Sequence, residues 1–367
     1  MKVHSIKEKE DLYYVKGVEF VKRRLILGCL FLILGFALVI TGCGNQDQGS
    51  GGDDGVETIV MRYTHGLGLD DPHHWVALRF QELVYEYSNG RVEVQIFPAD
   101  QLGSEQRGFQ DVQNGVVQAT SLAINNASVF SPSLGFLDLP YIFLTKEEFY
   151  EVIDDMWDEL NERMIAESGN KAIIWFEQGF RHITNSVRPI ETIEDLRGLR
   201  IRVPPNPMML GAFEAWGSNA TPMAWGEVFN GLQYGIIDGQ ENPHGVNNSM
   251  SFYEVQSYIT EIHYKMWIGP VVVNNQWFQR QDADIQEAIL RAGREVSVEV
   301  RDVIVEMEQA ALENLLAHGM INFGPPRDEE VWVELAMAIW PDFYDTIAGT
   351  EMLERAMGIL GREVPQP

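Results

Sequence analysis

Hydrophobic and polar positions along this chain switch repeatedly between two spacings, beginning near Val56. Residues 58–63 have the composition of a strand, and residues 91–97 alternate with the period of two that predicts another. Between them, residues 72–87 place apolar side chains at helical spacing, and Asn89-Gly90 marks the expected end of that helix. Strand, helix and strand in succession form a β-α-β unit, so we expect α/β layers built from mostly parallel strands.

The same alternation continues along the chain. A second group of elements is expected to begin near Arg181, and its clearest strand stops at Pro204-Pro205. The further predicted elements are helices over 104–115 and from the Thr145-x-x-Glu148 capping box onward, a helical turn over 192–198, and strands over 117–122, 171–176, 199–203 and 269–274.

The longest apolar stripe predicts a helix over about residues 284–318, terminated by Gly319. At about 1.5 Å per residue such a helix spans about 50 Å, which exceeds the width of one domain of this size. We therefore expect it to bridge two lobes of one α/β body.

A different pattern precedes the folded part. Lys22, Arg23 and Arg24 stand before an uncharged apolar run over residues 25–40. This arrangement is typical of a signal peptide, and Ile40-Thr41-Gly42-Cys43 resembles the bacterial lipobox, so Cys43 is expected to be the acylated first residue of the mature protein. The alternative is an uncleaved membrane anchor, since the apolar run is only slightly shorter than the roughly 20 residues that span a bilayer.

These patterns give an expected organisation with a leader, a tether and two lobes. Residues 45–55 contain no apolar side chain, which predicts a flexible linker. The expected segments are a lipoprotein signal peptide over 1–42, a tether over 43–55, lobe I over 56–178 plus 269–306, and lobe II over 179–268 plus 307–367.

Charge and cysteine content narrow the possible functions. The chain has 27 Lys and Arg and 54 Asp and Glu, of which seven and four lie in residues 1–42, so the mature chain carries a net charge of −30. A polyanionic surface argues against nucleic acid, and it requires an anionic ligand to meet local cationic groups. Apart from Cys43 the only cysteine is Cys29, in the segment to be removed, which leaves no disulfide and no cysteine nucleophile.

Enzyme motifs are missing from the sequence. It has no Gly-x-Ser-x-Gly elbow, no His-Glu-x-x-His pair and no Walker loop, and Gly66-Leu67-Gly68 lacks the third glycine of a dinucleotide site. His73 and His74 are adjacent, so they point to different sides of a helix and make a poor metal pair. We therefore expect no cofactor and no metal. His65 follows a strand in a Gly-rich loop, where α/β proteins place ligand contacts.

Two arginines stand on one face of the strand over 199–203. Arg200 and Arg202 are two residues apart, so they share a face, and burying that face is costly. At least one of them is therefore expected to meet an anion or an acidic side chain. For Arg200 we favour an ion pair with an acidic side chain on a solvated surface. Arg202 lies at the strand's exit, and its planar guanidinium suits a ligand carboxylate.

Six spaced blocks of sequence carry a family resemblance. The chain resembles the solute-binding subunits of tripartite ATP-independent periplasmic (TRAP) transporters over nearly all of its mature length. The blocks are Phe97-Pro98 with Gln101-Leu102-Gly103, Leu139-Pro140-Tyr141-Ile142-Phe143, Gly179-Phe180-Arg181, Thr184-Asn185, the strand over 199–203 together with Thr221 to Phe229, and Gly235 to Pro243. The resemblance implies a two-lobed fold with hinge strands and one long bridging helix, a ligand held between the lobes, and membrane permease subunits as partners.

The resemblance also implies which residues bind the ligand. The family's carboxylate-binding arginine matches Arg202, its second arginine Arg181, its asparagine Asn242 and its cleft aromatic residue Trp225. His65, Glu105 and Asn125 match more weakly, and Asn125 has the alternative role of capping the next turn. An acidic contact of the sialic-acid branch falls at Ala123, so a ligand smaller than sialic acid is expected.

Three hypotheses follow for the function. The first is a lipid-anchored solute-binding protein on the periplasmic side of the cell membrane, which closes on a small organic carboxylate; it is a monomer or a dimer formed through the long helix. The second is a subunit that presents ligand to a sensory receptor. The third is a secreted enzyme acting on carboxylates, for which only Glu241 or Glu227 with His65 offers an acid and a base.

Overall fold

The computed structural model describes residues 58–366. The chain divides into Met1–Gly55 and Val56–Pro367, and the second unit contains all of the described residues. The predicted signal peptide, Cys43 and the tether lie outside the described residues. Within residues 58–366, no helix combines the length and the hydrophobicity that a membrane crossing needs.

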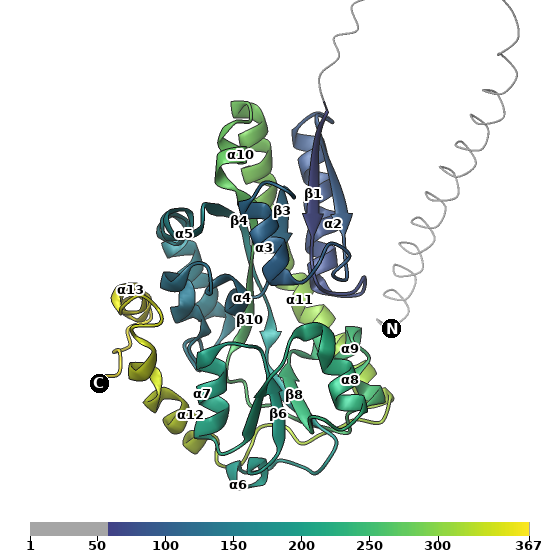
Figure 1. Ribbon diagram of the computed structural model, residues 1–367, viewed down its shortest axis with the longest axis vertical. Coiled ribbons are helices and arrows are strands. Elements are labelled where there is room, and N and C mark those ends of the chain that lie inside the picture. Colours follow the sequence, from purple (N-terminus) through teal and green to yellow (C-terminus); the bar gives the residue numbers. More distant parts are fainter. Residues whose placement is uncertain (1–57, 367) are drawn as a thin grey trace, which may run out of the picture. The chain divides into compact units, whose positions relative to one another are not determined.

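The first of two sheets has the strand order β2-β1-β3-β10-β4. In it β1 (Ile59–Thr64) pairs in parallel with β2 (Val92–Phe97) and β3 (Ala119–Ser121). β10 (Met266–Asn274) runs antiparallel between β3 and β4 (Asn170–Phe180). In Figure 1 this sheet occupies the upper half of the described unit.

The second sheet lies in the lower half of the same view and has the order β11-β9-β5-β8-β6-β7. Its strands are β11 (Ile321–Asn322), β9 (Tyr258–Thr260), β5 (His182–Asn185), β8 (Gly239–Asn242), β6 (Arg200–Val203) and β7 (Asn219–Pro222). β6 pairs in parallel with β7 and β8, whereas β5 runs antiparallel to both β8 and β9.

The expectation of mostly parallel strands is therefore only partly right. The chain passes from the first sheet to the second at Arg181, between β4 and β5, and returns through residues 261–265, between β9 and β10. These two connections run in opposite directions, so the strands that carry them pair antiparallel with their neighbours. They are the hinge strands that the two-lobed fold requires.

The helices that the sequence predicts lie close to their expected positions, and the structure adds others. The long ones are α2 (Pro72–Tyr87), α5 (Lys146–Ser168) and α11 (Ala283–Ala317). The others are α3 (Glu105–Gln113), α4 (Ile124–Ala127), η2 (Pro132–Asp138), α6 (Ile193–Leu196), α7 (Pro207–Ala215), η3 (Trp225–Glu227), α8 (Val228–Gln233), α9 (His244–Ser249), η4 (Phe252–Glu254), α10 (Asn275–Gln279), α12 (Glu329–Ala338), η5 (Trp340–Phe343) and α13 (Glu351–Ile359).

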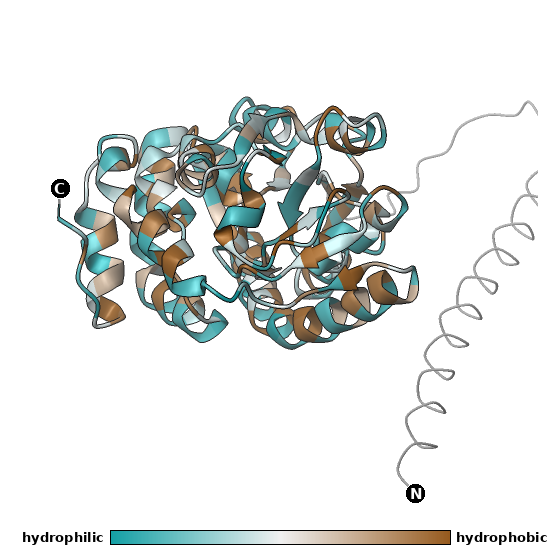
Figure 2. Ribbon diagram, turned by 90° about the horizontal axis from the view of Figure 1, so that it is seen from below, coloured by the Kyte–Doolittle hydropathy of each residue, from teal (hydrophilic) through white to brown (hydrophobic). Residues whose placement is uncertain are grey.

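Side-chain caps explain where several helices begin. Thr145 accepts a hydrogen bond from the backbone N–H of Glu148 at 3.2 Å, which is half of the predicted capping box, while the Glu148 side chain accepts from the backbone N–H of Leu144 at 2.7 Å. Gly169 ends α5 in the left-handed conformation at a φ of 74°. Figure 2 shows the resulting helices with alternating hydrophobic and hydrophilic bands, the amphipathic pattern of helices that each cover a sheet.

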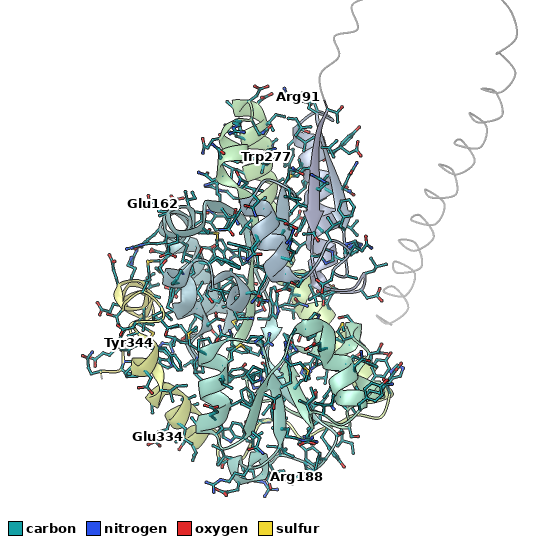
Figure 3. All side chains as sticks on the ribbon, viewed as in Figure 1. Arg91, Glu162, Arg188, Trp277, Glu334 and Tyr344 are labelled. Atoms are coloured by element: carbon teal, nitrogen blue, oxygen red, sulfur yellow. The ribbon has the colours of Figure 1, made fainter. Side chains whose placement is uncertain are left out.

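The long helix bridges the two sheets, which confirms the expected role of α11. It packs against α2 and β4 beside the first sheet and against α9 beside the second. Ile285, Val296 and Ile304 of its apolar stripe are buried. The two-lobed α/β fold expected from the sequence is thus confirmed, with Arg91 and Arg188 at opposite ends of the described unit (Figure 3).

Separate hydrophobic cores cover the faces of the sheets. One face of the first sheet packs on α2 and α11, and the other packs on α5. Trp340 and Leu353, from the C-terminal part of the chain, join the core beneath α5, and α13 contacts α5 directly. The predicted lobe boundaries stay a prediction, and this packing supports assigning residues 340–359 to the lobe of the first sheet.

Candidate ligand-binding site

A cavity of about 150 Å³ lies among residues that follow the strands of both sheets. From the side of the second sheet it is lined by Arg181, Arg202, Trp225 and Asn242, and from the side of the first sheet by Glu105 and Asn125. The structure therefore brings together every residue that the sequence placed in the ligand site except His65. Ligand sites of α/β proteins form where the strands end, and this cavity follows that rule.

Arg202 lies in β6, and its side chain is only 3% exposed. Its Nε and Nη2 atoms donate hydrogen bonds to the backbone oxygen of Met223 at 3.0 and 2.8 Å, and its guanidinium carbon lies 5.6 Å from the centre of the Trp225 ring. Among residues 58–366, no carboxylate lies within ion-pair distance of it; Glu241 forms its ion pair with Arg181.

This environment leaves the charge of Arg202 uncompensated. Burial lowers the pKa of Arg202 to about 10, against the opposing effect of Glu241. A buried cation without a counter-ion is costly, and an anion bound in the cavity removes that cost. The geometry of Arg202 thus favours an anionic ligand.

Arg200, in contrast to Arg202, has the surface ion pair expected from the sequence. It is exposed and pairs with Asp238 through two hydrogen bonds, Nε to Oδ2 at 3.1 Å and Nη2 to Oδ1 at 2.5 Å. Since its charge is matched by a protein carboxylate at the surface, Arg200 is not available to a ligand.

Arg181 lines the cavity but already has an acidic partner. Its Nε donates to Glu241 Oε2 at 2.5 Å and its Nη2 donates to Oε1 at 2.8 Å, and the hydroxyl of Tyr264 donates to the same carboxylate at 2.7 Å. All three residues are buried. Burial disfavours the charged guanidinium, but Glu241 outweighs it and the pKa of Arg181 is raised. This pairing leaves Arg202 as the arginine of the cavity whose charge remains to be balanced.

Asn242 and Asn125 add polar groups to the wall. Asn242, at the end of β8, donates from Nδ2 to Gln240 Oε1 at 2.6 Å, which fixes the orientation of its amide. Asn125 lies inside α4, after the N-cap position Ala123, so it does not cap the start of that helix. Its neighbour Asn126 instead donates to Glu105 Oε2 at 2.7 Å.

Two carboxylates form the wall on the side of the first sheet. Glu105 accepts hydrogen bonds at Oε2 from Asn126 and from the backbone N–H of Ala123, the latter at 3.0 Å, while burial raises its pKa to about 7. Asp100, which the sequence reasoning missed, also lines the cavity, and burial raises its pKa to about 6. Its signal was present, because the blocks Phe97-Pro98 and Gln101-Leu102-Gly103 frame it directly.

His65 does not line the cavity, which corrects the expectation from the sequence. It is 2% exposed, and its Nε2 lies 3.2 Å from Nδ1 of His74. Burial, together with His74, lowers the pKa of His65 to about 4. The side chain turns toward α2 and packs beside His73 and His74.

The groups of the enzyme hypothesis are not assembled at the cavity. Glu241 is held by Arg181, and Glu227 is exposed and absent from the lining. Residues 58–366 contain no cluster of histidine, cysteine and acidic side chains arranged to hold a metal ion.

Comparison with known proteins identifies relatives of the chain. Residues 63–346 match the family described as bacterial extracellular solute-binding protein, family 7. The 2,3-diketo-L-gulonate-binding periplasmic protein of Escherichia coli K12 is 29% identical over 260 residues, which cover 71% of this chain and 79% of that protein.

Solved structures share the fold. A TRAP periplasmic solute-binding protein from Rhodobacter sphaeroides, in an open form without ligand, is 44% identical with a TM-score of 0.73, covering 83% of this chain and 99% of that one. A sugar-acid-binding protein from Advenella mimigardefordensis in complex with galactonate is 26% identical with a TM-score of 0.79, covering 83% and 98%. These relatives are ligand-binding transport proteins rather than enzymes.

Proposed function

Because the chain belongs to family 7 of the bacterial extracellular solute-binding proteins, the solute-binding subunits of TRAP transporters, we propose that it captures a small organic carboxylate in the cavity beside Arg202. The observation that carries this proposal is the buried guanidinium of Arg202, which has no carboxylate partner among the described residues. A ligand carboxylate completes its hydrogen bonding and balances its charge.

Each wall of the cavity has a role in this capture. Arg202 binds the carboxylate, Asn242 and Arg181 contribute hydrogen bonds beside it, and the ring of Trp225 covers the ligand. Glu105 and Asn125 contact the ligand from the side of the first sheet. Since the two walls belong to different sheets, binding is coupled to closure about the hinge strands, and closure excludes water from the ionic hydrogen bonds.

The comparisons favour a sugar acid. The Escherichia coli relative is named for 2,3-diketo-L-gulonate, and the Advenella structure holds galactonate. Both compounds are carboxylates with several oxygen substituents, and the acidic wall of this cavity offers acceptors for hydroxyl groups. A C4-dicarboxylate, a 2-oxo acid and an aromatic acid are the other carboxylates to test.

The proposed setting is the outer face of the cell membrane. Relatives of the chain are periplasmic, and Ile40-Thr41-Gly42-Cys43 supports a lipid anchor on Cys43. The loaded protein delivers its ligand to membrane permease subunits for secondary transport. Delivery to a sensory receptor is the alternative, and neighbouring permease genes would distinguish the two.

A thermal-shift screen over organic acids tests the proposal. Bound ligand stabilises the folded state by mass action, so a sugar acid at 100 times its Kd adds about 2.7 kcal/mol to the free energy of unfolding. Each acid is compared with its uncharged alcohol or amide at equal concentration. If no carboxylate raises the melting temperature above its neutral partner, the proposed function is wrong.

A further inference from the structure

Asp100 has a carboxylate oxygen that the protein leaves unsatisfied. Its Oδ1 is buried and has no hydrogen-bond partner within residues 58–366, and the residue lines the ligand cavity. Buried polar atoms are nearly always hydrogen-bonded, since each unpaired one costs free energy. Because the same residue lines the cavity, the Asp100 carboxylate is a charged group with unused acceptor capacity beside the ligand.

The backbone that carries Asp100 is strained and firmly held. Ala99 and Asp100 have left-handed φ angles of 52° and 56°, a conformation that costs free energy for alanine. Backbone hydrogen bonds fix the turn against the loop after β1: Ala99 donates to Leu67 at 3.0 Å and Asp100 donates to His65 at 3.2 Å. Such a turn persists where the surrounding structure fixes it, and here it delivers Asp100 to the cavity.

Gly66 leaves the room in which two carboxylates approach each other. A Cβ atom at this position would lie 2.9 Å from Asp100 Oδ1 and 3.2 Å from Glu105 Cγ. A side chain at residue 66 would therefore have to displace the Asp100 carboxylate and crowd Glu105. Asp100 also raises the pKa of Glu105, as one negative charge near another must.

The cavity consequently has two chemically different ends. Arg202 presents hydrogen-bond donors from the second sheet, and Asp100 and Glu105 present acceptors from the first. A dicarboxylate bound at Arg202 would place its second negative charge against two carboxylates in a poorly hydrated space. A hydroxyl group there would instead donate a hydrogen bond to the Asp100 carboxylate.

Resting on the proposed function, we infer that Asp100 is a specificity-determining residue, which together with Glu105 accepts hydrogen bonds from the hydroxyl groups of the ligand and selects hydroxylated monocarboxylates over dicarboxylates. The burial of the two carboxylates supports this. Burial makes both carboxylates easier to protonate, with pKa values of about 6 and 7, and donors from a ligand offset that effect.

The test is a calorimetric comparison of the wild type with Asp100→Asn. Asparagine has nearly the same shape and tolerates the left-handed backbone, so the turn is kept while the negative charge is lost. The matched control is Asp70→Asn, which removes an exposed carboxylate from a nearby loop outside the cavity. The probes are D-erythronate and D-galactonate, their deoxy partners butanoate and hexanoate, and succinate.

The wild type is expected to bind one of the hydroxy acids at least about 100-fold more tightly than its deoxy partner and than succinate, since a site built for hydroxyl groups rejects ligands that lack them. Asp100→Asn should weaken the hydroxy acid about tenfold, because a neutral acceptor replaces a charged one. It should leave the deoxy acid unchanged and strengthen succinate, whereas Asp70→Asn should change none of these affinities.

Contrary outcomes distinguish failure of the inference about Asp100 from failure of the proposed function. If Asp100→Asn weakens hydroxy and deoxy acids equally, or changes neither, Asp100 has only a structural role and the inference fails. The inference also fails if succinate binds the wild type as tightly as the hydroxy acids. If the wild type binds none of these acids and no other carboxylate in the thermal-shift screen, the proposed function itself fails.

Discussion

At the scale of single residues, the ligand preference we propose for the cavity follows from which arginines have acidic partners within the protein. Arg200 is paired with Asp238 at the surface, and Arg181 is paired with Glu241 in the interior. Within the part of the chain that the structure describes, Arg202 has only the backbone oxygen of Met223 and the face of Trp225. A guanidinium buried in this way is held ready for an anion, which is why we assign the carboxylate to Arg202.

The substitution Arg202→Lys should weaken carboxylate binding by about tenfold or more. An ammonium group is a single point charge, so it loses the planar fork that makes two parallel hydrogen bonds. Titration calorimetry with the acid found in the screen measures the change. The matched control is Arg200→Lys on the same strand, which should alter affinity by less than about twofold, and equal losses in the two variants would remove Arg202 from the binding site.

Sequence and structure differ most instructively at this scale. The i, i+2 spacing placed Arg200 and Arg202 on one face, and the surface ion pair expected for Arg200 is present with Asp238. The ligand role of Arg202 stays a prediction. The Arg181–Glu241 pair could not be predicted from the sequence, because its partners are far apart along the chain and meet only through the antiparallel register of β5 and β8. His65 was misplaced because a residue's position after a strand does not determine which way its side chain turns.

At the scale of elements, the long helix and the hinge strands hold the two lobes together. The length of α11 was predictable from its apolar stripe and its glycine stop. The strand directions were harder to predict, because the sequence does not show that extended chain crosses between the sheets in opposite directions, at Arg181 and again before Met266. One close contact secures the helix: Gly293 of α11 packs directly on the backbone of β4 at Ile173.

Gly293→Ala should destabilise the protein by about 1–3 kcal/mol, because the added methyl group would overlap the carbonyl oxygen of Ile173. Gly358 of α13 provides the comparison, since a Cβ there meets no atom within 4 Å. Gly358→Ala should stabilise by about 0.5–1 kcal/mol through the higher helix propensity of alanine. Urea unfolding of both variants measures the difference, and a neutral Gly293→Ala would show that α11 does not lie this close to β4.

His182, where β5 begins, should make stability depend on pH. Its ring lies 4.5 Å from that of His244 and 4.6 Å from that of His263. These three histidines line a second cavity, apart from the ligand site, together with Glu177, Glu261 and Glu308. Burial, reinforced by the two other histidines, lowers the pKa of His182 well below 6.5. The unfolded chain therefore binds more protons than the folded one just below pH 6.5, so the free energy of unfolding falls as the pH falls through that range.

The substitution His182→Gln removes the proton-binding group and should reduce this loss. Urea unfolding at pH 7.5 and pH 5 measures the difference for the wild type, the variant and an exposed control, His318→Gln. The pKa shifts of the nearby carboxylates are common to all three proteins, so their effect on the free energy of unfolding cancels in the comparison. Should the control reduce the acid sensitivity as much as His182→Gln, the buried imidazole is not its source.

At the scale of the whole molecule, ligand capture and hinge bending involve the same residues. Arg181 lines the cavity and is also the point at which the chain passes from β4 in the first sheet to β5 in the second. Asp100 and Glu105 approach from one sheet, while Arg202 and Asn242 approach from the other. A bound acid therefore contacts both lobes, so it stabilises the closed form relative to an open one.

The most direct test of this account is a calorimetric titration of the purified protein with the best acid from the screen and, separately, with its carboxamide. The account predicts one mole of acid bound per mole of protein and no measurable binding of the carboxamide, because only a carboxylate balances the buried charge of Arg202. Binding of the carboxamide as tightly as the acid would contradict it.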